Sequence, residues 1–515
     1  MGLIKTYGSA VYGITAITIT LEVSVSKGIN FYMVGLPDNA VKESQQRIIT
    51  ALQENGYKMP GQKIVINMAP ADIKKEGSAY DLPLAIGILA ASGQIETDFL
   101  DKYVIMGELS LDGSIQPIKG ALPMALQAQQ EGFKGLILPL QNAREAAVVQ
   151  GLEVYGVENI KQTIEFIIGA QKLEPIVIDI DKEFYQNVLL TDVDFADVKG
   201  QENVKRAMEI AASGGHNVIM IGPPGAGKTM LAKRLSTILP PLTLEEALET
   251  TKIHSVAGKI ERNSSLITQR PYRSPHHTIS DVALVGGGAF PQPGEISLAH
   301  NGVLFLDELP EFKRTALEVM RQPLEDRNIC ISRAKFSVQY PASFMLVASM
   351  NPCPCGYFNH PEKDCVCTNG VVQKYLNKIS GPLLDRIDIH IEVVPVPFSK
   401  LAETKNGETS HDIRQKVIKA REVQKKRFSN HTGVHCNAQM SSKQLRKHCV
   451  LDDASKALLK NAMEKLGLSA RAYDRILKVS RTIADLEVSE SIQAQHIAEA
   501  IQYRSLDRDN WGSKM

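Results

Sequence analysis

The sequence predicts an α/β protein whose central part is a parallel sheet carrying a phosphate-binding loop. Three observations lead to this fold class. From about residue 195, apolar strands alternate with helical patterns, as they do in parallel sheets covered by helices. A glycine-rich string lies between one of these strands and the helix that follows it. After Pro397 the sequence becomes charged and helical, which indicates a separate α-helical subdomain.

The N-terminal part, residues 1–170, is expected to be a mixed α+β domain. β-branched residues alternate with other residues in its first strand, which is typical of a half-buried strand. One later segment is apolar all round and fits a helix buried in a core. We expect strands at 14–25, 63–68 and 104–111 and helices at 40–55 and 82–91.

Three further segments follow along the chain. Residues 171–195 carry scattered acids and no helical period, so they are interpreted as a linker. The α/β core is expected over 196–400, and the helical subdomain over 401–515. Strands are expected at 217–221, 302–306 and 344–349, and helices of the subdomain at 413–428, 454–466, 470–486 and 492–503.

Composition narrows the class of protein. A chain of 515 residues suffices for about three domains. Lys and Arg number 58 against 57 Asp and Glu, so a nucleic-acid partner would need local basic patches. No apolar run approaches the ~20 residues of a spanning helix, and the N-terminus lacks a secretion signal. Seven cysteines do not make a disulfide scaffold. We expect a cytoplasmic protein without a membrane partner.

The string at 222–229 matches the whole phosphate-loop pattern G-x-x-x-x-G-K-[ST]. Glycines let backbone N–H groups face phosphates, and the following helix start adds favourable partial charge. The lysine can reach the β and γ phosphates, and the threonine hydroxyl can ligate Mg²⁺. A chance glycine-rich turn is the alternative, but the flanking strand and helix argue against it. The expected ATP-binding residues are Gly222, Pro223, Pro224, Gly225, Ala226, Gly227, Lys228 and Thr229.

A pair of acids ends the apolar strand at 303–306. Carboxylates at the carboxyl end of a parallel strand point into the ligand crevice. Asp307 can hold Mg²⁺, and Glu308 can orient and deprotonate the attacking water. The alternative is a capped helix start, since Leu309 and Pro310 follow. Beside a phosphate loop, the pair favours hydrolysis of a nucleoside triphosphate.

These motifs resemble the AAA+ ATPases of the magnesium-chelatase-like branch and, more closely, the bacterial ComM/YifB family. The strings that carry the resemblance are RPYRSPHHT at 270–278, PGEISLAH at 293–300 and SARAYDR at 469–475. The resemblance covers the N-terminal domain, the core and the helical tail. It implies a P-loop AAA+ core, and it implies hexameric rings.

The resemblance also assigns roles to three polar residues. Asn351 would be the sensor that helps place the attacking water. Arg386, in the string GPLLDRID, would be the arginine finger that reaches a neighbour's γ-phosphate and speeds hydrolysis by ~10³-fold or more. Arg471 would be the second sensor, on the helical subdomain. By residue type alone, each arginine also suits an ordinary surface ion pair.

Insertions between the two nucleotide motifs are expected to face the pore of such a ring. They include Gly286 to Gly288. A further candidate pore element follows the second motif, a hairpin at 329–336 with a basic, aromatic tip. Arg333 and Lys335 at that tip are candidates for sequence-independent DNA contacts through phosphates. An ordinary hairpin with solvated charges fits the same residues. The neighbouring His276 and His277 have poor geometry for a metal, which favours a structural or pore-loop role.

Four cysteines form two C-x-C pairs, Cys353 with Cys355 and Cys365 with Cys367, in an insert at 353–367. Two such pairs can fold back to supply four thiolates to a tetrahedral Zn²⁺. A metal here would brace the loop beside the catalytic strand. A reduced thiol cluster or a redox switch is the alternative.

The N-terminal domain resembles the proteolytic domain of Lon, a ribosomal-S5-like fold, at 75–79, 107–113 and 117–120. Lon uses a Ser–Lys dyad, but by motif position the nucleophile falls at Ala79 and the lysine near Leu122. Without an activated hydroxyl there is no acyl-enzyme chemistry. The resemblance thus implies a non-proteolytic domain for binding or ring assembly.

The resemblance implies a hexameric ATP-driven DNA helicase that promotes branch migration when incoming single-stranded DNA recombines during natural transformation. Its partners would be single-stranded and branched DNA and recombination proteins. The basic stretch from Arg414 to Arg427 suits DNA, and it equally suits a solvated helix face. A chelatase motor subunit and a chaperone-like remodeller of proteins are the alternative functions.

Overall fold

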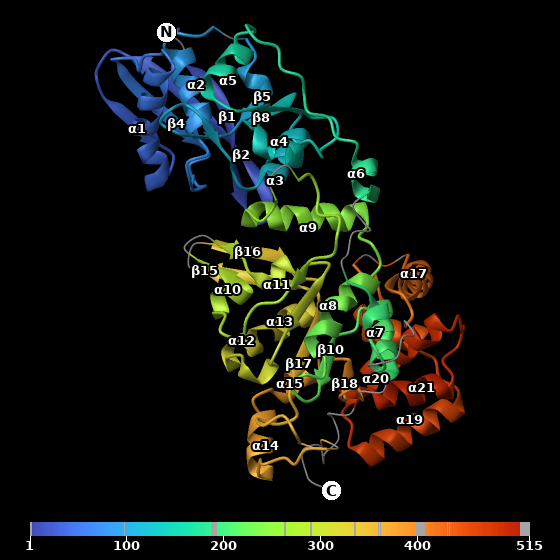
Figure 1. Ribbon diagram of the computed structural model, residues 1–515. Helices are drawn as coiled ribbons and strands as arrows, with labels where there is room; N and C mark the ends of the chain where they lie inside the picture. Colours follow the sequence, from blue (N-terminus) through green and yellow to red (C-terminus); the bar gives the residue numbers. More distant parts are fainter. Residues whose placement is uncertain are drawn as a thin grey trace.

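The computed structural model describes residues 3–96, 98–186, 193–261, 264–288, 291–333, 336–358, 360, 362–397, 407–429, 431 and 433–504. Figure 1 shows an N-terminal domain at the top, an α/β core below it, and C-terminal helices beside the core. Helix α9 (Leu244–Ala257) runs between the N-terminal domain and the core. The predicted fold class is confirmed.

The N-terminal domain is built on a seven-stranded mixed sheet with the order β3-β4-β2-β1-β5-β8-β9. β1 and β2 form an antiparallel hairpin, and the strands from β1 outward to β9 are parallel. Its strands are β1 (Ile4–Tyr12), β2 (Thr15–Ser26), β3 (Phe31–Val34), β4 (Lys63–Ala69), β5 (Tyr103–Ile105), β6 (Glu108–Leu109), β7 (Ile115–Gln116), β8 (Gly135–Pro139) and β9 (Glu153–Val157). Its helices are α1 (Asn39–Glu54), α2 (Asp81–Ala91), α3 (Ala121–Gln130), α4 (Leu140–Ala146) and α5 (Ile160–Ile167).

The patterns that predicted these elements also explain their packing. In β2, Leu21, Val23 and Val25 are buried, whereas the residues between them are partly exposed. A period of two places alternate side chains on opposite faces of a sheet. Nearly every residue of α2 is buried, as expected for a helix that is apolar all round. The strands predicted at 14–25 and 63–68 and both predicted helices are therefore confirmed.

The core contains a five-stranded parallel sheet with the order β11-β14-β17-β10-β18. Val218 and Met220 of β10 enter one apolar core, and Ile219 and Ile221 enter another on the opposite face. Burial on both faces explains why these strands are continuous apolar runs. The strands are β10 (Val218–Ile221), β11 (Tyr272–Arg273), β14 (Val303–Leu306), β17 (Met345–Met350) and β18 (Ile389–Glu392), which confirms the three that were predicted.

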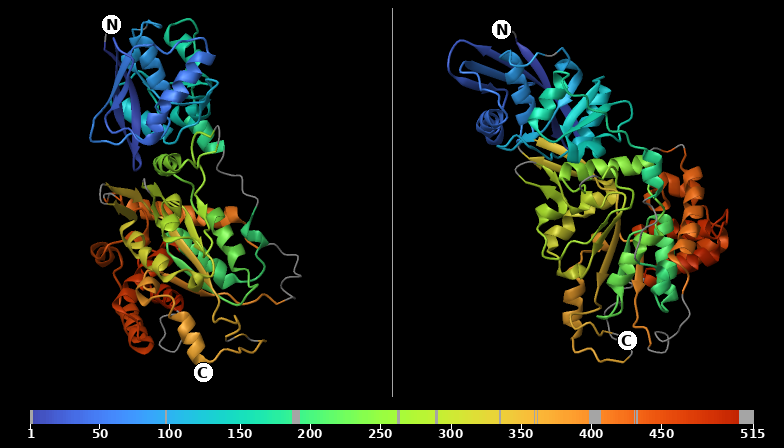
Figure 2. Two further views of the ribbon diagram at one scale, coloured as in Figure 1. Left: turned by 90° about the vertical axis from the view of Figure 1, so that its left-hand side faces the viewer. Right: turned by 45° about the horizontal axis from the view of Figure 1, so that its top comes forward.

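Helices and two hairpins complete the core. The helices are α7 (Glu202–Gly214), α8 (Lys228–Ile238), α10 (Asp281–Val285), α11 (Glu295–Leu298), α12 (Arg314–Val319), α13 (Arg321–Asp326), α14 (Asn369–Leu376) and α15 (Gly381–Leu384). The hairpins are β12 (Gly286–Gly287) with β13 (Gln292–Pro293), and β15 (Asn328–Arg333) with β16 (Phe336–Pro341). Figures 1 and 2 place α14 at the end of the core remote from the N-terminal domain.

The C-terminal part is helical, as predicted. Its helices are α17 (Ser410–Arg427), α18 (Ser442–His448), α19 (Asp453–Leu466), α20 (Ala470–Leu486) and α21 (Ala494–Gln502). The side chains of Thr409, Asp452 and Ser469 cap three of them by accepting backbone N–H bonds. The second half of α20 is buried against α7 and α17. Across the described residues, none of the helices combines the length and apolarity needed to cross a membrane.

Two helices connect the N-terminal domain to the core. Ser255 in α9 donates a hydrogen bond to the Glu145 carboxylate, and its carbonyl accepts one from the N–H of Gly120 at 3.2 Å. Helix α6 (Ile180–Gln186) lies within the predicted linker, where no helical period was visible in the sequence. Its Glu183 pairs with Arg144 of the N-terminal domain, and its Phe184 packs with Leu242 and Ala247. The short helix was missed because contacts with both neighbours stabilise a helix that is too short to form alone.

Candidate functional site

The phosphate loop connects the carboxyl end of β10 to α8, which begins at Lys228. A Cβ on Gly222 would lie 2.2 Å from the carbonyl oxygen of Val393, so this position requires glycine. Gly225 and Gly227 have φ values of +78° and +87°, in the left-handed region that favours glycine. The first N–H groups of a helix lack intrahelical partners, which makes the start of α8 a suitable anion site.

The side chain of Lys228 lies folded against its own loop. Its Nζ donates to the carbonyl oxygens of Gly222 at 2.7 Å and Pro223 at 3.0 Å, and to Asn351 Oδ1 at 3.1 Å. Burial lowers the pKa of Lys228, and two nearby carboxylates partly oppose this effect. A bound phosphate would stabilise the charged ammonium further. The structure thus brings the predicted residues Lys228 and Asn351 together.

Thr229 and Asp307 meet in the same place. The Thr229 hydroxyl donates to Asp307 Oδ2 at 2.9 Å, and Ser349 at the end of β17 donates to the other oxygen of Asp307. A hydroxyl and a carboxylate from facing elements are the oxygen ligands that suit Mg²⁺. These side chains therefore fit the predicted magnesium site. Ser349 was not predicted, although its position at the end of the 344–349 strand was a usable signal.

Glu308 follows with an unusual backbone, at φ +53°. Its N–H contacts Asp307 Oδ1 at 3.1 Å, and its side chain is 55% exposed. The ring of His277 approaches the carboxylate, with Nδ1 3.6 Å from Glu308 Oε2, and packs against His276 in a tilted arrangement with ring centroids 4.1 Å apart. We expected a structural or pore-loop role for the two histidines, and the approach of His277 to Glu308 was not predicted.

The two predicted arginines lie away from the phosphate loop of their own chain. Arg386 is 7% exposed and pairs with Glu325 and with the Pro382 carbonyl. Arg471 is 61% exposed, and its Nη1 lies 3.0 Å from Asp385 Oδ2. Both arginines are therefore in ion pairs within the chain. Their action on a nucleotide stays a prediction.

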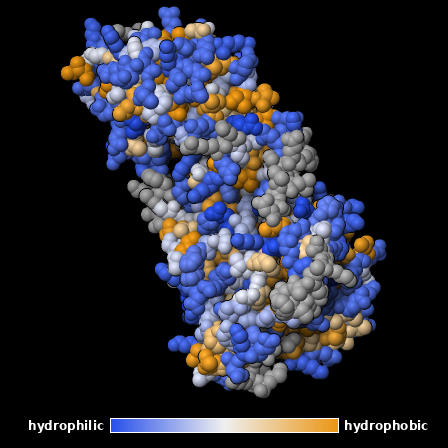
Figure 3. All heavy atoms as spheres, in the orientation of Figure 1, coloured by the Kyte–Doolittle hydropathy of each residue, from blue (hydrophilic) through white to orange (hydrophobic). Residues whose placement is uncertain are grey.

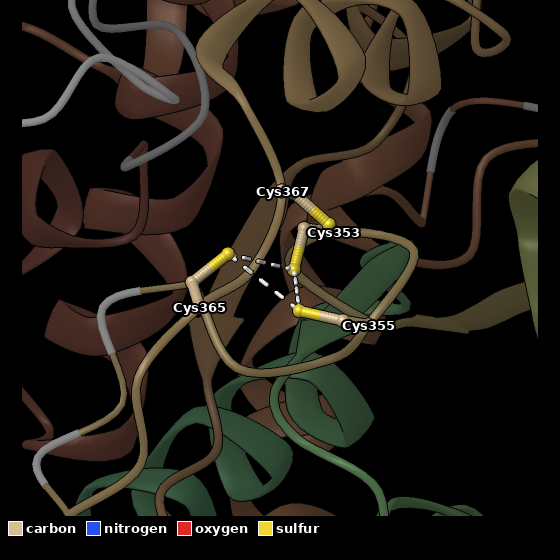
Figure 4. Close-up of side chains that lie close together, drawn as sticks. All are labelled: Cys353, Cys355, Cys365 and Cys367. Atoms are coloured by element: carbon tan, nitrogen blue, oxygen red, sulfur yellow. Dashed lines mark hydrogen bonds between the residues drawn. The ribbon is translucent and has the colours of Figure 1, made fainter.

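The four cysteines of the insert come together, as Figure 4 shows. All four sulfur atoms lie within 4.8 Å of one another. The separations from Cys353 Sγ are 3.3 Å to Cys355 Sγ and 3.7 Å to Cys365 Sγ. Burial raises the pKa of the Cys353 thiol. This arrangement offers four soft ligands to one ion, which is a donor set suited to Zn²⁺.

The candidate DNA-binding hairpin is present as β15 and β16, but the residues at its tip lie outside the described residues. Lys335 lies outside the described residues, and the side chain of Arg333 is likewise not described. The N-terminal domain contacts the hairpin near its tip, where the Tyr12 hydroxyl donates to the carbonyl of Ser337, a residue one pair away from the turn, at 3.1 Å. The half of the hairpin next to the tip therefore lies against a second domain.

In the N-terminal domain, Leu122 at the position expected for the Lon lysine is fully buried among apolar side chains. The Ser78 hydroxyl donates to the Glu108 carboxylate. Lys119 instead packs its aliphatic stem against Gly258, where an added Cβ would lie 2.8 Å from Lys119 Cε. The absence of proteolytic activity in this domain stays a prediction.

A parallel sheet with a phosphate loop after β10, acids after β14 and a polar residue after β17 defines the class of P-loop ATPases. Family models extend this result. The model described as "Magnesium chelatase, subunit ChlI" matches residues 194–401, "Subunit ChlI of Mg-chelatase" matches 21–142, and "Magnesium chelatase, subunit ChlI C-terminal" matches 407–504.

Relatives extend along the whole chain. It is 45% identical to "Competence protein ComM" of Haemophilus influenzae over 511 residues, which cover 99% of this chain and 98% of that protein. It is 44% identical to "Uncharacterized protein YifB" of Escherichia coli K12 over 513 residues, with coverages of 99% and 98%. The chain belongs to the ComM/YifB family of magnesium-chelatase-like AAA+ ATPases.

A third relative concerns the N-terminal domain. "Lon protease 2" of Bacillus subtilis is 30% identical over 145 residues, which cover 28% of this chain and 26% of that protein. This similarity agrees with the expected Lon-like fold at the N-terminus.

Proposed function

We propose that this chain is one subunit of a hexameric ring that hydrolyses ATP in order to move DNA. The observation that carries the proposal is the meeting of Lys228 with Asn351, and of Thr229 with Asp307, at one edge of the parallel sheet. Phosphate binding, Mg²⁺ ligation and water positioning require these groups in P-loop ATPases. The similarity to a competence protein supports DNA as the substrate and branch migration during natural transformation as the task.

The residues divide the work of hydrolysis. The loop backbone and Lys228 bind and orient the phosphates, while the Thr229 hydroxyl and the Asp307 carboxylate are placed to hold Mg²⁺. The metal, when bound, neutralises charge that develops on the phosphoryl oxygens. Glu308 takes the proton of the attacking water, and Asn351 positions that water. His277, close to Glu308, limits where that carboxylate can lie.

In the proposed ring, Arg386 acts in the nucleotide site of the neighbouring chain. Because Arg386 is bound to Glu325 of its own chain, a role at a neighbour's γ-phosphate requires its release during assembly or ATP binding. Positive charge that arrives with the transition state is worth far more than charge already present in the ground state. If Arg386 exchanges its partner Glu325 for the neighbour's γ-phosphate, contact between subunits is coupled to hydrolysis.

The β15–β16 hairpin is the proposed DNA contact, through Arg333 and Lys335. The basic helix α17 is a weaker candidate, because several of its cations are engaged within the chain. Arg414 donates to the Thr237 carbonyl, Arg421 to the Ala212 carbonyl, and Arg427 pairs with Asp485. Figure 3 shows hydrophilic side chains over most of the visible face, with scattered apolar ones.

We further propose Zn²⁺ as a resident ion of Cys353, Cys355, Cys365 and Cys367. Soft thiolates within one ion's reach support zinc over an oxygen-preferring metal. Free thiols that must stay reduced also support a cytoplasmic location.

A chelatase motor subunit is the second candidate function, favoured by the family models that match the N-terminal part, the core and the C-terminal part. A chaperone-like remodeller of protein partners is the third. The full-length similarity to a competence protein and the cysteine insert argue for the DNA motor over the chelatase. Stimulation of ATP hydrolysis by branched DNA favours the motor, whereas stimulation only by chelatase partner subunits favours the second candidate.

The decisive experiment compares the wild-type chain with Lys228→Ala on a three-stranded DNA junction with ATP. The variant should lose at least about 100-fold in ATP hydrolysis, because the charge that stabilises the phosphoryl oxygens is gone. Strand exchange, followed by gel electrophoresis of labelled strands, should stop as well.

Lys233→Ala is the matched control, since Lys233 lies on the same helix and is exposed to solvent. It should retain both activities. ATP hydrolysis by the wild type without any strand exchange above the spontaneous rate would contradict the DNA motor and leave the ATPase.

A further inference from the structure

The loop that carries the cysteine cluster begins inside the nucleotide site. Asn351, which accepts a hydrogen bond from Lys228 at 3.1 Å, is the last residue before it. Pro352 and Cys353 follow directly and are buried. Cys353, the first cysteine of the cluster, is therefore two residues from Asn351, whose side chain contacts Lys228 of the phosphate loop. Displacement of the cysteine turn would move Asn351 through this short connection.

A second contact joins the cluster to the phosphate loop itself. Gly356 follows Cys355 and closes a turn in which its N–H donates to the Cys353 carbonyl at 3.0 Å. A Cβ on Gly356 would lie 2.5 Å from Cδ of Pro224, so the turn rests on the phosphate loop without space for a methyl group. A cavity of about 90 Å³, lined by Pro223, Pro352 and Gly356 among others, adjoins this contact.

The apolar packing of the insert is small. Among the described residues, its cluster has three buried side chains, Cys353, Phe358 and Val372 of α14, with the other three cysteines and Leu376 packed against them. Small units with so few buried apolar groups usually need a metal or disulfides to be ordered. The cysteines are free, and their sulfur atoms converge on one point, so a metal ion is the available cross-link.

We propose that the four-cysteine site is a metal-dependent brace of the nucleotide site, a role that rests on the ATPase function proposed above. One Zn²⁺ bound by the four thiolates fixes the turn at Gly356 against Pro224 and keeps Asn351 beside Lys228. Loss of the ion to a chelator releases both contacts together. ATP binding and turnover then depend on occupancy of a site that touches no nucleotide.

The test separates metal binding from contact with the phosphate loop by using two variants of the full-length chain. Cys365→Ser removes a ligand, whereas Gly356→Ala keeps every ligand and adds a methyl group at the contact. Metal content is measured by mass spectrometry of the purified protein, nucleotide affinity with a fluorescent ADP analogue, and kcat with a phosphate-release assay.

The wild type should carry one zinc ion per chain. Cys365→Ser should lose that ion, and both its nucleotide affinity and its kcat should fall about tenfold or more. Gly356→Ala should keep the zinc and show a similar fall in affinity and kcat. If the metal stabilised only its own insert, Cys365→Ser would lose the zinc without a fall in nucleotide affinity.

Two controls match these changes. Gly433→Ala adds a methyl group at an exposed glycine that shares the left-handed backbone of Gly356, with φ +78° against +86°, but has no atom within 4 Å, and it should leave zinc, affinity and kcat unchanged. Cys330→Ser, at an exposed cysteine outside the cluster, controls for metal content and should keep one zinc.

Three results would overturn the brace. They are a zinc-free wild type that binds nucleotide normally, a zinc-free Cys365→Ser with wild-type affinity, and a Gly356→Ala variant with wild-type affinity. If the wild type carries zinc yet never hydrolyses ATP, the proposed function fails on its own. The brace is then decided by nucleotide affinity in the same variants.

Discussion

Glu308 combines a left-handed backbone with a half-exposed carboxylate. Non-glycine residues in this region are held by their surroundings and are enriched at functional sites. Here the holding contacts are the Glu308 N–H to Asp307 and Ser349 and the approach of His277 to the carboxylate. The backbone sets the direction of the side chain, and the imidazole limits its swing.

Replacement of Glu308 by Gln tests its assignment as the base. The amide keeps the size of the side chain but cannot accept the proton of the attacking water. We expect kcat for ATP to fall about 10²-fold or more with little change in nucleotide affinity. Steady-state phosphate release and binding of a fluorescent ATP analogue measure the two quantities. A variant that hydrolyses ATP at the wild-type rate would assign the base elsewhere.

At the scale of elements, a buried ion pair joins the core to helix α20. Asp388 lies just before β18, and its Oδ1 is 2.9 Å from Arg475 Nη1 in α20. Its other oxygen accepts from the N–H of Asn217 at 3.1 Å and approaches His216. Burial acts to raise the pKa of Asp388, but Arg475 and His216 outweigh it, and the pKa lies well below its usual range.

Asp388→Asn should therefore destabilise the protein by about 3 kcal/mol, since it leaves Arg475, only 19% exposed, without its partner. Because the folded pKa lies well below the unfolded value of about 3.9, the stabilisation is fully present above that pH and is lost progressively as the pH falls from there through the folded pKa. Thermal unfolding should show a large difference between wild type and variant at pH 7 that shrinks below about pH 4.

Asp385→Asn is the control for that substitution. Asp385 lies three residues earlier and pairs with the largely exposed Arg471. Its loss should cost less than about 1 kcal/mol, because exposed pairs are screened by water. Equal effects of the two substitutions would show that Asp388 is not the anchor of α20.

At the scale of the whole molecule, the proposed ring divides each active site between two chains. Lys228→Ala disables the phosphate loop but keeps Arg386, and Arg386→Ala does the reverse. A mixture of the two inactive variants should recover ATP hydrolysis, because random assembly creates roughly one intact interface in four. Phosphate release at several mixing ratios measures the recovery. No recovery in mixed rings of proven composition would place Arg386 outside the neighbour's site.

The N-terminal domain contacts the core of the proposed ring subunit through α9. This helix belongs to the core by sequence, yet it packs on α3, and Leu266, which follows it, joins the apolar core of the N-terminal domain. Figure 2 shows the two parts in contact along this helix and the β15–β16 hairpin. Motion of the core during hydrolysis would therefore reach the N-terminal domain through packed side chains.

Features that depend on residues close together in the sequence were predictable, whereas features that depend on residues far apart were not. The phosphate loop and the acids at 307 and 308 were predictable, because eight consecutive residues or one strand end carry the signal. The cysteine cluster was predictable as well, because its two pairs lie within one short loop. The approach of His277 to Glu308 and the pairing of Arg386 with Glu325 were not predictable, since residues far apart in sequence meet only after the sheet and helices have packed.

The sequence by itself determined the class of site, the family and the order of strands and helices, since periodicity and local backbone preference act within a few residues. Only the tertiary structure decided that Gly356 rests on Pro224, that α6 is a helix, and that α9 connects two domains. Each of these depends on which surfaces exclude water from one another. That choice is made by the free energy of the whole packed chain and is not encoded in any single segment.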